Sequence, residues 1–440
     1  MPAIYLRMAA VILAFGALLM ALRQLQARWA PHPEIIRKLL HVGMGLVALS
    51  FPWLFPERWP VLVLAGFSLL ILLGLKWVAP LKQNYGQVID GVGRHSLGDF
   101  FYPAAIGTIF YLSHGHPILF GIPVLVLALA DAVGALIGGR YGLVHYDTLD
   151  GHKSVEGSVA FFTVAFLSTH IPLLLATSTG RAESLLIGLT LGLLIMLMEA
   201  VAWRGLDNLF IPIGSYLLLK NYLELDLLTL VGRFSAALAL VFLVLSWRRH
   251  ATLNHCALVS AMLFGYACWA LGGWPWLVGP VTFYLSYTLL SPLVGKQAPQ
   301  VSLNALLSVT SMALACLFLA KTHPAWDLFY IYTLSLAIHL CLVVLVRLKF
   351  NYPKTSLLLL LGAAIGKSWL LIVLPLALLR GFSYMILLQI GIAFPILVLA
   401  ALAFYFSQPK IEDYPVDHER WIRQAIIAAG SACLGLVTIF

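Results

Sequence analysis

The sequence of 440 residues has too few charges for a water-soluble protein. Only 10% of its residues are charged, whereas 61% are hydrophobic, and the mean hydropathy is +0.95. A soluble chain of this length needs more charge to cover its surface. Apolar runs of roughly 17–25 residues recur throughout, the length that crosses a ~30 Å hydrocarbon core. The sequence therefore predicts an all-α, polytopic integral membrane protein, and runs that do not alternate exclude a transmembrane β-barrel.

The chain also lacks paired cysteines and nucleic-acid-binding motifs. Its five cysteines have no CxxC spacing and lie in predicted spans, so we expect neither disulfides nor a zinc site. The net charge of +9 comes without a basic tail or a basic patch interleaved with aromatic residues. We attribute it to the Lys and Arg bias of cytoplasmic loops and expect no nucleic acid among the partners.

We expect about sixteen transmembrane helices. Their centres lie near residues 15, 48, 68, 106, 127, 166, 194, 214, 236, 262, 285, 311, 336, 366, 394 and 432. When the loops are assigned to alternate sides, nineteen Lys and Arg fall on one side and six on the other. The richer side is predicted to be cytoplasmic, so that both termini face outward. The short loops favour a bacterial inner membrane, with the endoplasmic reticulum or a plastid membrane as alternatives.

Carboxylates are scarce in the second half of the chain. Thirteen of the eighteen Asp and Glu lie at or before Asp226, and only Asp327 and one loop cluster follow. Because Mg²⁺ prefers hard oxygen ligands, we expect metal–phosphate chemistry only in the first half. We place a boundary near Trp247–Leu253, which gives a catalytic domain at residues 1–247 and a helical membrane domain of unassigned role at residues 248–440.

Four clusters of polar residues lie on the side predicted to be cytoplasmic. They are Glu34, Arg37, Lys38 and His41; Arg94, Gly98, Asp99, Tyr102 and Pro103; Asp131 to Gly142 followed by His152 to Ser158; and Glu199, Asp207, Asn208 and Pro212. Taken alone, the first cluster is better explained as an interfacial anchor at a helix end. Asp99 and Asp207 each lie at the start of a predicted helix, where a carboxylate can simply cap the helix. Glu199 lies inside a span, where a charge is costly without a partner.

The third cluster carries the strongest indication of chemistry. Asp131 lies inside the cytoplasmic end of an apolar helix, so its ionised carboxylate needs a partner or a cation. Gly134 and Gly138 form a small-xxx-small strip, which is more often a helix-packing surface than a ligand site. Lys153 immediately precedes the next helix, and a helix N-terminus with a lysine beside it can bind a phosphate group. The alternative is that Lys153 is an ordinary lysine of a cytoplasmic loop.

Together the clusters offer intramembrane carboxylates, a glycine-rich turn and a lysine at a helix start, which suits phosphoryl or nucleotidyl transfer. Carboxylates can hold Mg²⁺, the metal and the lysine can neutralise phosphate charge, and a carboxylate can accept a hydroxyl proton. The chain has no P-loop of the GxxxxGK[ST] type. Because the site would lie at the membrane surface, we expect a lipid acceptor.

The segment Asp131–Ser158 resembles the nucleotide-binding signature of the polyprenol kinase family, which includes dolichol kinase and phytol kinase. In that family an Asp-x-x-Ala/Gly helix and a glycine-rich turn precede Lys-Ser/Thr-x-Glu-Gly-Ser/Thr. The other three clusters are similar to the flanking motifs, so the resemblance covers roughly residues 34–215. It implies transfer of the γ-phosphate of CTP to an isoprenoid alcohol, with Mg²⁺ as cofactor. His145 replaces the basic residue usual after the turn, which leaves the choice of nucleotide open.

The resemblance also assigns roles to residues. It places Asp131, the glycine turn, Lys153 and Glu156 near the nucleotide, and the roles within the whole set are our own inference. We expect Asp131, Lys153, Glu156, Asp207 and Asn208 in catalysis; Gly134, Gly138, Gly139, Gly142, Lys153, Ser154, Gly157, Arg37, Lys38 and His41 at the nucleotide; Asp131, Asp207 and Glu199 at the metal; and Asp99 and Arg94 elsewhere in the site. The expected partners are CTP, an alcohol of the dolichol, polyprenol or phytol type and the lipid bilayer. A homodimer is compatible with the sequence.

Two other functions stay open. A CDP-lipid synthase (phosphatidate cytidylyltransferase) shares a similar Asp…Gly…Lys stretch, but its downstream Pro-Gly-His-Gly-Gly…Asp-Arg signature is absent here. A lipid transporter or flippase would explain the many spans and the charges Glu199 and Lys367, but we detect no internal repeat. In the second half, Gly272–Trp276 and Phe283–Ser291 are weakly similar to the integral-membrane phytyl-phosphate kinase family, although the acidic residues such an enzyme needs are missing there.

Overall fold

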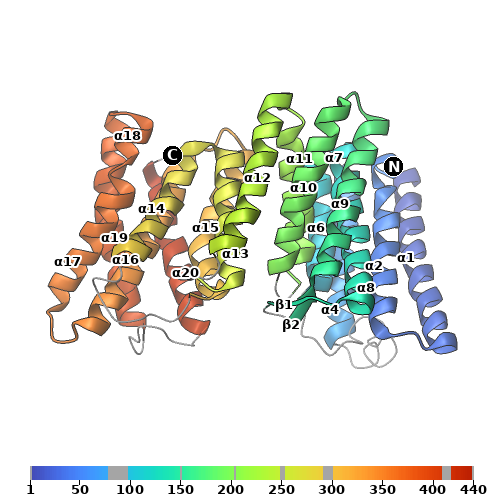
Figure 1. Ribbon diagram of the computed structural model, residues 1–440, viewed down its shortest axis with the longest axis horizontal. Coiled ribbons are helices and arrows are strands. Elements are labelled where there is room, and N and C mark those ends of the chain that lie inside the picture. The colour runs from blue at the N-terminus through green and yellow to red at the C-terminus, as the bar shows by residue number, and fades with distance from the viewer. Residues whose placement is uncertain are drawn as a thin grey trace. The chain divides into compact units, whose positions relative to one another are not determined.

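The chain folds as helices arranged in two compact units, Met1–Val241 and Phe242–Phe440, each described by itself (Figure 1). The computed structural model describes residues 2–77, 98–148, 151–202, 205–247, 253–290, 301–408 and 418–438. Within these ranges, the named non-helical elements are two short strands that form one hairpin. The units divide inside α12 (Leu227–Trp247), whereas the sequence places the boundary at the end of that helix.

Twelve helices in the described ranges are long and apolar enough to cross a membrane, so the all-α polytopic class is confirmed. The expected number of about sixteen spans is wrong by this measure. The four other segments, near residues 68, 106, 214 and 285, are helices with shorter apolar stretches. Two of them, α6 (Gly98–Ser113) and α11 (Asp207–Tyr222), have 16 residues each, carry an aspartate in the first turn and contain a proline.

Unit 1 contains twelve named helical segments among its described residues. They are α1 (Pro2–Trp29), α2 (Pro33–Leu49), α3 (Phe51–Leu54), α4 (Trp59–Trp77), α6, α7 (Pro117–Leu125), the π-helical η1 (Val126–Ala130), α8 (Asp131–Tyr141), α9 (Val155–Ala176), α10 (Arg181–Val201), α11 and α12. The segments α7, η1 and α8 form one continuous span, Pro117–Tyr141. The π-helical stretch ends immediately before Asp131, and such stretches are often found at functional sites.

A short hairpin connects α8 to α9 at one end of unit 1 (Figure 1). Its strands, β1 (His145–Thr148) and β2 (Gly151–Ser154), are antiparallel, and Tyr146 pairs with Lys153. Helix α9 begins directly after β2, where the Ser154 hydroxyl accepts a hydrogen bond of 3.1 Å from the Gly157 amide. This cap fixes the end of the strand against the helix start, and Lys153 lies at that junction.

Helices α8 and α9 pack closely because both present glycine at their interface. A Cβ atom added at Gly157 would lie 2.8 Å from the Gly134 carbonyl oxygen and 2.9 Å from the Gly138 Cα atom. A Cβ atom at Gly138 would lie 2.9 Å from the Ser154 hydroxyl oxygen. Gly134, Gly138 and Gly157 therefore form the small-residue interface that lets two transmembrane helices approach.

Replacing Gly157 by alanine should therefore destabilise unit 1 by about 1–3 kcal/mol, because the added methyl group must push the two backbones apart. Gly139 is the matched control, since a Cβ atom there would meet nothing within 4 Å. Thermal unfolding of the purified variants in detergent checks this expectation. Equal unfolding midpoints for Gly157→Ala and Gly139→Ala would contradict it.

Unit 2 is built around α16 (Phe329–Asn351), of whose apolar stretch 89% is buried. The other named segments are α13 (His255–Ala267), η2 (Cys268–Gly272), α14 (Trp274–Leu290), α15 (Leu303–Thr322), α17 (Leu357–Ser368), η4 (Trp369–Val373), α18 (Leu376–Arg380), α19 (Tyr384–Ser407), α20 (His418–Cys433) and η5 (Leu434–Thr438). Helices α15, α17, α19 and α20 all pack against α16. The two described carboxylates of unit 2, Asp327 and Glu419, are exposed and lie beside arginines.

Candidate functional site

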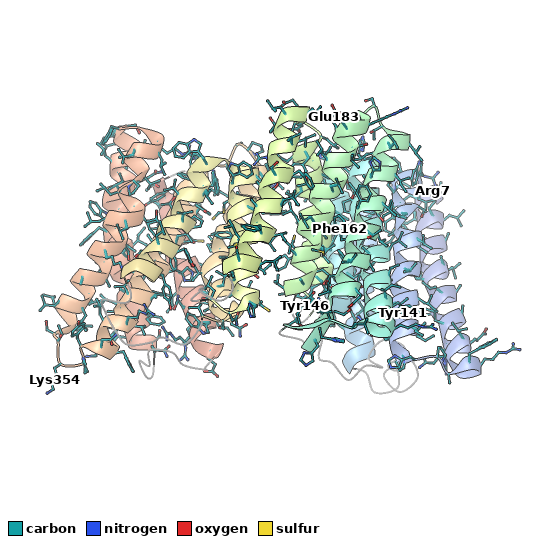
Figure 2. The ribbon with its side chains drawn as sticks, viewed as in Figure 1. Arg7, Tyr141, Tyr146, Phe162, Glu183 and Lys354 are labelled. Atoms are coloured by element: carbon teal, nitrogen blue, oxygen red, sulfur yellow. The ribbon has the colours of Figure 1, made fainter. Side chains whose placement is uncertain are left out.

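The polar clusters of unit 1 converge at the end that carries the hairpin. Figure 2 shows Tyr141 and Tyr146 at this end, whereas Arg7 and Glu183 lie at the opposite end of the unit. The charged side chains that meet here come from α2, α8, β2, α10 and α11. Residues separated by more than 150 positions in the chain therefore share one site.

A buried ion pair joins α2 to α8. The Lys38 ammonium lies 2.7 and 2.6 Å from the two carboxylate oxygens of Asp131, and the two side chains are only 4% and 9% exposed. His41, one turn after Lys38, has its Nε2 atom 3.8 Å from the Asp131 carboxylate and 3.2 Å from the Leu127 carbonyl oxygen. An isolated charge at this depth would be very unfavourable, so each member of the pair supplies the opposite charge that the other needs.

Arg37 lies at the more exposed rim of the same helix. Its guanidinium forms a two-point ion pair with Glu34, with nitrogen–oxygen distances of 2.6 and 3.1 Å. Arg37 also interacts electrostatically with Asp131 and Asp207, which places it at the edge of the same cluster. The interfacial-anchor explanation therefore fits Glu34 and Arg37, whereas Lys38 and His41 point into the buried site.

A second ion pair joins β2 to the last turn of α10. The Lys153 ammonium lies 2.8 Å from a Glu199 carboxylate oxygen and also donates to the Glu199 backbone oxygen. These side chains are 27% and 19% exposed, so this pair is nearer to solvent than the first. Burial lowers the pKa of Lys153, but the Glu199 carboxylate more than offsets burial, and the pKa stays above its ordinary value. Lys153 is therefore a permanent cation in the site.

The start of α11 completes the cluster. Asp207 interacts electrostatically with Asp131, Lys153 and Lys38. The buried side chain of Asn208 donates a hydrogen bond of 3.0 Å to the Gly98 carbonyl oxygen, which ties the first turn of α11 to the first turn of α6. Asn208 thus has a structural contact in addition to the catalytic role that the sequence predicts.

The remaining predicted residues lie around this cluster. The partly exposed Glu156 carboxylate accepts a hydrogen bond of 3.2 Å from the Val144 amide and so links the hairpin to the first turn of α9. The Gly142 amide donates to the Gly138 carbonyl oxygen at the end of α8. Asp99 lies in the first turn of α6, and Arg94 falls outside the described residues. The described contacts of Glu156 do not join it to the lysine–carboxylate cluster, and the predicted roles of these residues stay predictions.

The carboxylates are compatible with magnesium, although they do not form a metal cage. Within the described ranges, no three His, Cys, Asp or Glu side chains are grouped to hold a metal ion by themselves. Mg²⁺ in phosphoryl-transfer sites usually uses one or two carboxylates together with substrate phosphates and water. Asp131 and Asp207 could supply that number of ligands, but both oxygens of Asp131 are bound by Lys38 here.

The sequence predicted that Asp131 and Glu199 need partners, but it did not identify them. Lys38 precedes Asp131 by 93 positions, and Lys153 precedes Glu199 by 46. The sequence offered one indication of these partners, which is the small number of charged residues inside the spans. Each buried carboxylate needs a cation close to it, and few are present. Tyr102, which the sequence named only as part of a motif, packs edge-on against His41 and belongs to the same site.

Comparison with curated proteins identifies the phytol kinase of Synechocystis sp. as similar to this chain. The two sequences are 33% identical over 187 residues, which cover 42% of this chain and 78% of that protein. No protein-family model matches the chain, and no solved structure matches it significantly.

Proposed function

The chain belongs to the phytol kinase family, and from this premise we propose that it transfers the γ-phosphoryl group of CTP to the hydroxyl of a long-chain isoprenoid alcohol. The observation that carries the proposal is the convergence of two lysines and three carboxylates at one membrane-proximal end of unit 1. Phosphoryl transfer requires positioning and charge stabilisation rather than a protein nucleophile, and this set of residues provides both.

Lys153 is the cation best placed to bind the transferred phosphate. It is partly exposed, stays protonated, and lies at the start of α9, whose first amides add positive potential. Arg37 extends the cationic surface towards solvent, where a nucleotide arrives. Lys38 pairs with Asp131 in the buried part of the site.

Asp207 is the proposed acceptor of the alcohol proton. In the reaction, the alcohol oxygen forms a bond to the γ-phosphorus while the bond from that phosphorus to the β,γ-bridging oxygen breaks, and CDP leaves with the electron pair. The proton of the alcohol passes to the Asp207 carboxylate. This assignment is supported by the position of Asp207 in the first turn of α11, where it interacts electrostatically with Lys38 and Lys153.

Magnesium, when bound with the nucleotide, would be held by Asp131 and Asp207, with Glu199 as a further oxygen donor after Lys153 turns to the phosphate. It would supply additional neutralisation of phosphate charge. The Lys and Arg bias of the loops supports a cytoplasmic location for this end of unit 1.

The proposal predicts a specific set of products. Purified full-length protein, incubated with CTP and a panel of alcohols from farnesol to phytol, undecaprenol and dolichol, should release CDP in equal amount to the lipid monophosphate formed. A parallel panel with ATP tests the nucleotide. Excess EDTA should abolish the reaction.

Pyrophosphate release with a CDP-linked lipid would instead identify a CDP-lipid synthase and reject the kinase. Turnover that persists in excess EDTA would reject the metal role of the carboxylates. If neither product forms with any alcohol or nucleotide, the enzymatic proposal fails and transport becomes the leading alternative.

A further inference from the structure

The hydroxyl of Tyr102, on α6, is buried without a hydrogen-bond partner among the described residues. The residue is only 6% exposed. Buried hydroxyl groups in folded proteins are nearly always hydrogen-bonded, and one that is not requires an explanation. Inside a membrane the deficit is more serious, because hydrocarbon offers no donor or acceptor to replace water.

This hydroxyl lies where α2, η1 and α6 meet. The Tyr102 ring packs edge-on against the His41 ring, with ring centres 4.7 Å apart. A Cβ atom added at Gly45 would lie 3.4 Å from the Tyr102 hydroxyl oxygen and would also contact the Ala128 Cβ atom. The unpartnered hydroxyl therefore belongs to a ring that packs against His41, whose Nε2 atom is 3.8 Å from the Asp131 carboxylate.

The depth of this hydroxyl distinguishes between the two substrates. Lys38, His41 and Gly45 follow one another at spacings of three and four, so they line one face of α2. Along this face, the charged Lys38 lies towards the rim that carries Arg37, and the Tyr102 hydroxyl lies at the level of Gly45, farther along the helix. A charged nucleotide approaches from the rim, whereas a lipid presents its hydroxyl from the hydrocarbon side.

We propose that the Tyr102 hydroxyl binds the hydroxyl oxygen of the acceptor alcohol, and this inference rests on the proposed function. The Tyr102 hydroxyl donates a hydrogen bond to one lone pair of the alcohol oxygen, and the other lone pair stays available for the phosphorus. The contact selects for an alcohol, because a hydrocarbon of the same length leaves the buried phenol unpaired. Tyr102 is thus a specificity-determining residue for the acceptor.

The test compares Tyr102→Phe with Tyr216→Phe. Tyr216 is a matched control because it is also buried, yet its hydroxyl donates a hydrogen bond of 2.8 Å to the Leu112 carbonyl oxygen, away from the cluster. Tyr102→Phe should raise KM for the alcohol about tenfold or lower kcat by a similar factor, with KM for CTP unchanged. Its thermal unfolding midpoint should not fall, because no hydrogen bond to a described residue is lost. Tyr216→Phe should show the reverse pattern, with a lower midpoint and unchanged KM values.

Unchanged kinetics for Tyr102→Phe would overturn the inference and leave the hydroxyl with, at most, a trapped water. A change confined to KM for CTP would also overturn it, because the group would then serve the nucleotide. Either result leaves the kinase proposal intact as long as the wild-type protein forms lipid monophosphate.

A binding measurement covers the case in which no alcohol is phosphorylated. Phytol should raise the unfolding midpoint of the wild-type protein more than the corresponding hydrocarbon without the hydroxyl does. Tyr102→Phe should lose that difference, and Tyr216→Phe should keep it. Equal differences in the wild-type protein and Tyr102→Phe would reject the contact independently of catalysis.

Discussion

Replacing Asp131 by alanine is expected both to abolish phosphoryl transfer and to destabilise the protein. The substitution removes a carboxylate proposed to hold magnesium, and it leaves the Lys38 ammonium buried without its partner. Breaking a buried ion pair in this way typically costs about 3–5 kcal/mol. Lipid monophosphate formation measures the first effect, and the thermal unfolding midpoint in detergent measures the second.

A double variant separates the two effects. Lys38→Met combined with Asp131→Leu replaces the ion pair with apolar side chains of similar size, which usually restores stability and sometimes increases it. The double variant should therefore unfold near the wild-type temperature and still be inactive. Recovered activity in this variant would show that neither charge takes part in the reaction. Unchanged stability of Asp131→Ala would show that the ion pair contributes little to the fold.

Replacing Lys153 by alanine should reduce kcat by about 10²- to 10³-fold, the usual effect of removing one group that stabilises charge in the transition state. Stability should change little, because this side chain is 27% exposed and its pairing with Glu199 is nearer to solvent. Lys153→Arg should recover part of the loss, since it keeps the positive charge but changes the geometry of the contact. Steady-state kinetics with CTP and the alcohol that the wild-type protein phosphorylates fastest measure the loss in Lys153→Ala and the recovery in Lys153→Arg.

Lys220 is the matched control for Lys153. It is an exposed lysine in the last turn of α11, and α11 begins at the site with Asp207. Lys220→Ala should keep wild-type kinetics. A Lys153→Ala protein with kcat and KM values equal to those of Lys220→Ala would remove Lys153 from the proposed mechanism.

The fold class followed from composition alone, but the number of spans did not. Long apolar runs predict membrane helices because a helix must satisfy its own backbone hydrogen bonds in hydrocarbon. The same rule miscounted α6 and α11, which are helices of only 16 residues with Asp99 and Asp207 in their first turns. Hydropathy shows that such a segment is apolar. Where the helix begins and ends depends instead on the neighbouring helices that bury it, so hydropathy does not give its length.

Within the site, the sequence predicted which residues need a partner. It did not predict which residue that partner is. A carboxylate at Asp131 inside an apolar helix indicates a nearby cation on energetic grounds. Its identity, Lys38, depends on the packing of α2 against the span that contains Asp131, and no spacing in the chain records that packing. The pairing of Lys153 with Glu199 depends in the same way on the hairpin and the last turn of α10.

The glycines show a different limit of sequence inference. Their spacing is typical both of helix packing and of a phosphate-binding turn, and the sequence alone left the two alternatives open. In the structure Gly138 and Gly157 contact one another's helices, whereas Gly139 faces open space. The glycine spacing therefore identified the segment that contains Gly134 to Gly157. Whether each glycine packs against a neighbouring helix depends on the direction of its Cα–H bond, which the spacing does not give. A contact of any of them with a nucleotide stays a prediction.

The shortness of α6 and α11 has a consequence for the surrounding lipid. At about 1.5 Å per residue, helices of 16 residues span about 24 Å, less than the ~30 Å thickness of the hydrocarbon core. The two helices pack against each other and start together, since Asn208 binds the Gly98 carbonyl oxygen. Neighbouring helices bury most of α11, so the start of this pair can lie below the bilayer surface, at the level of the acyl chains. Under the proposed function, a lipid would then react at Asp207 without withdrawing its apolar tail into water.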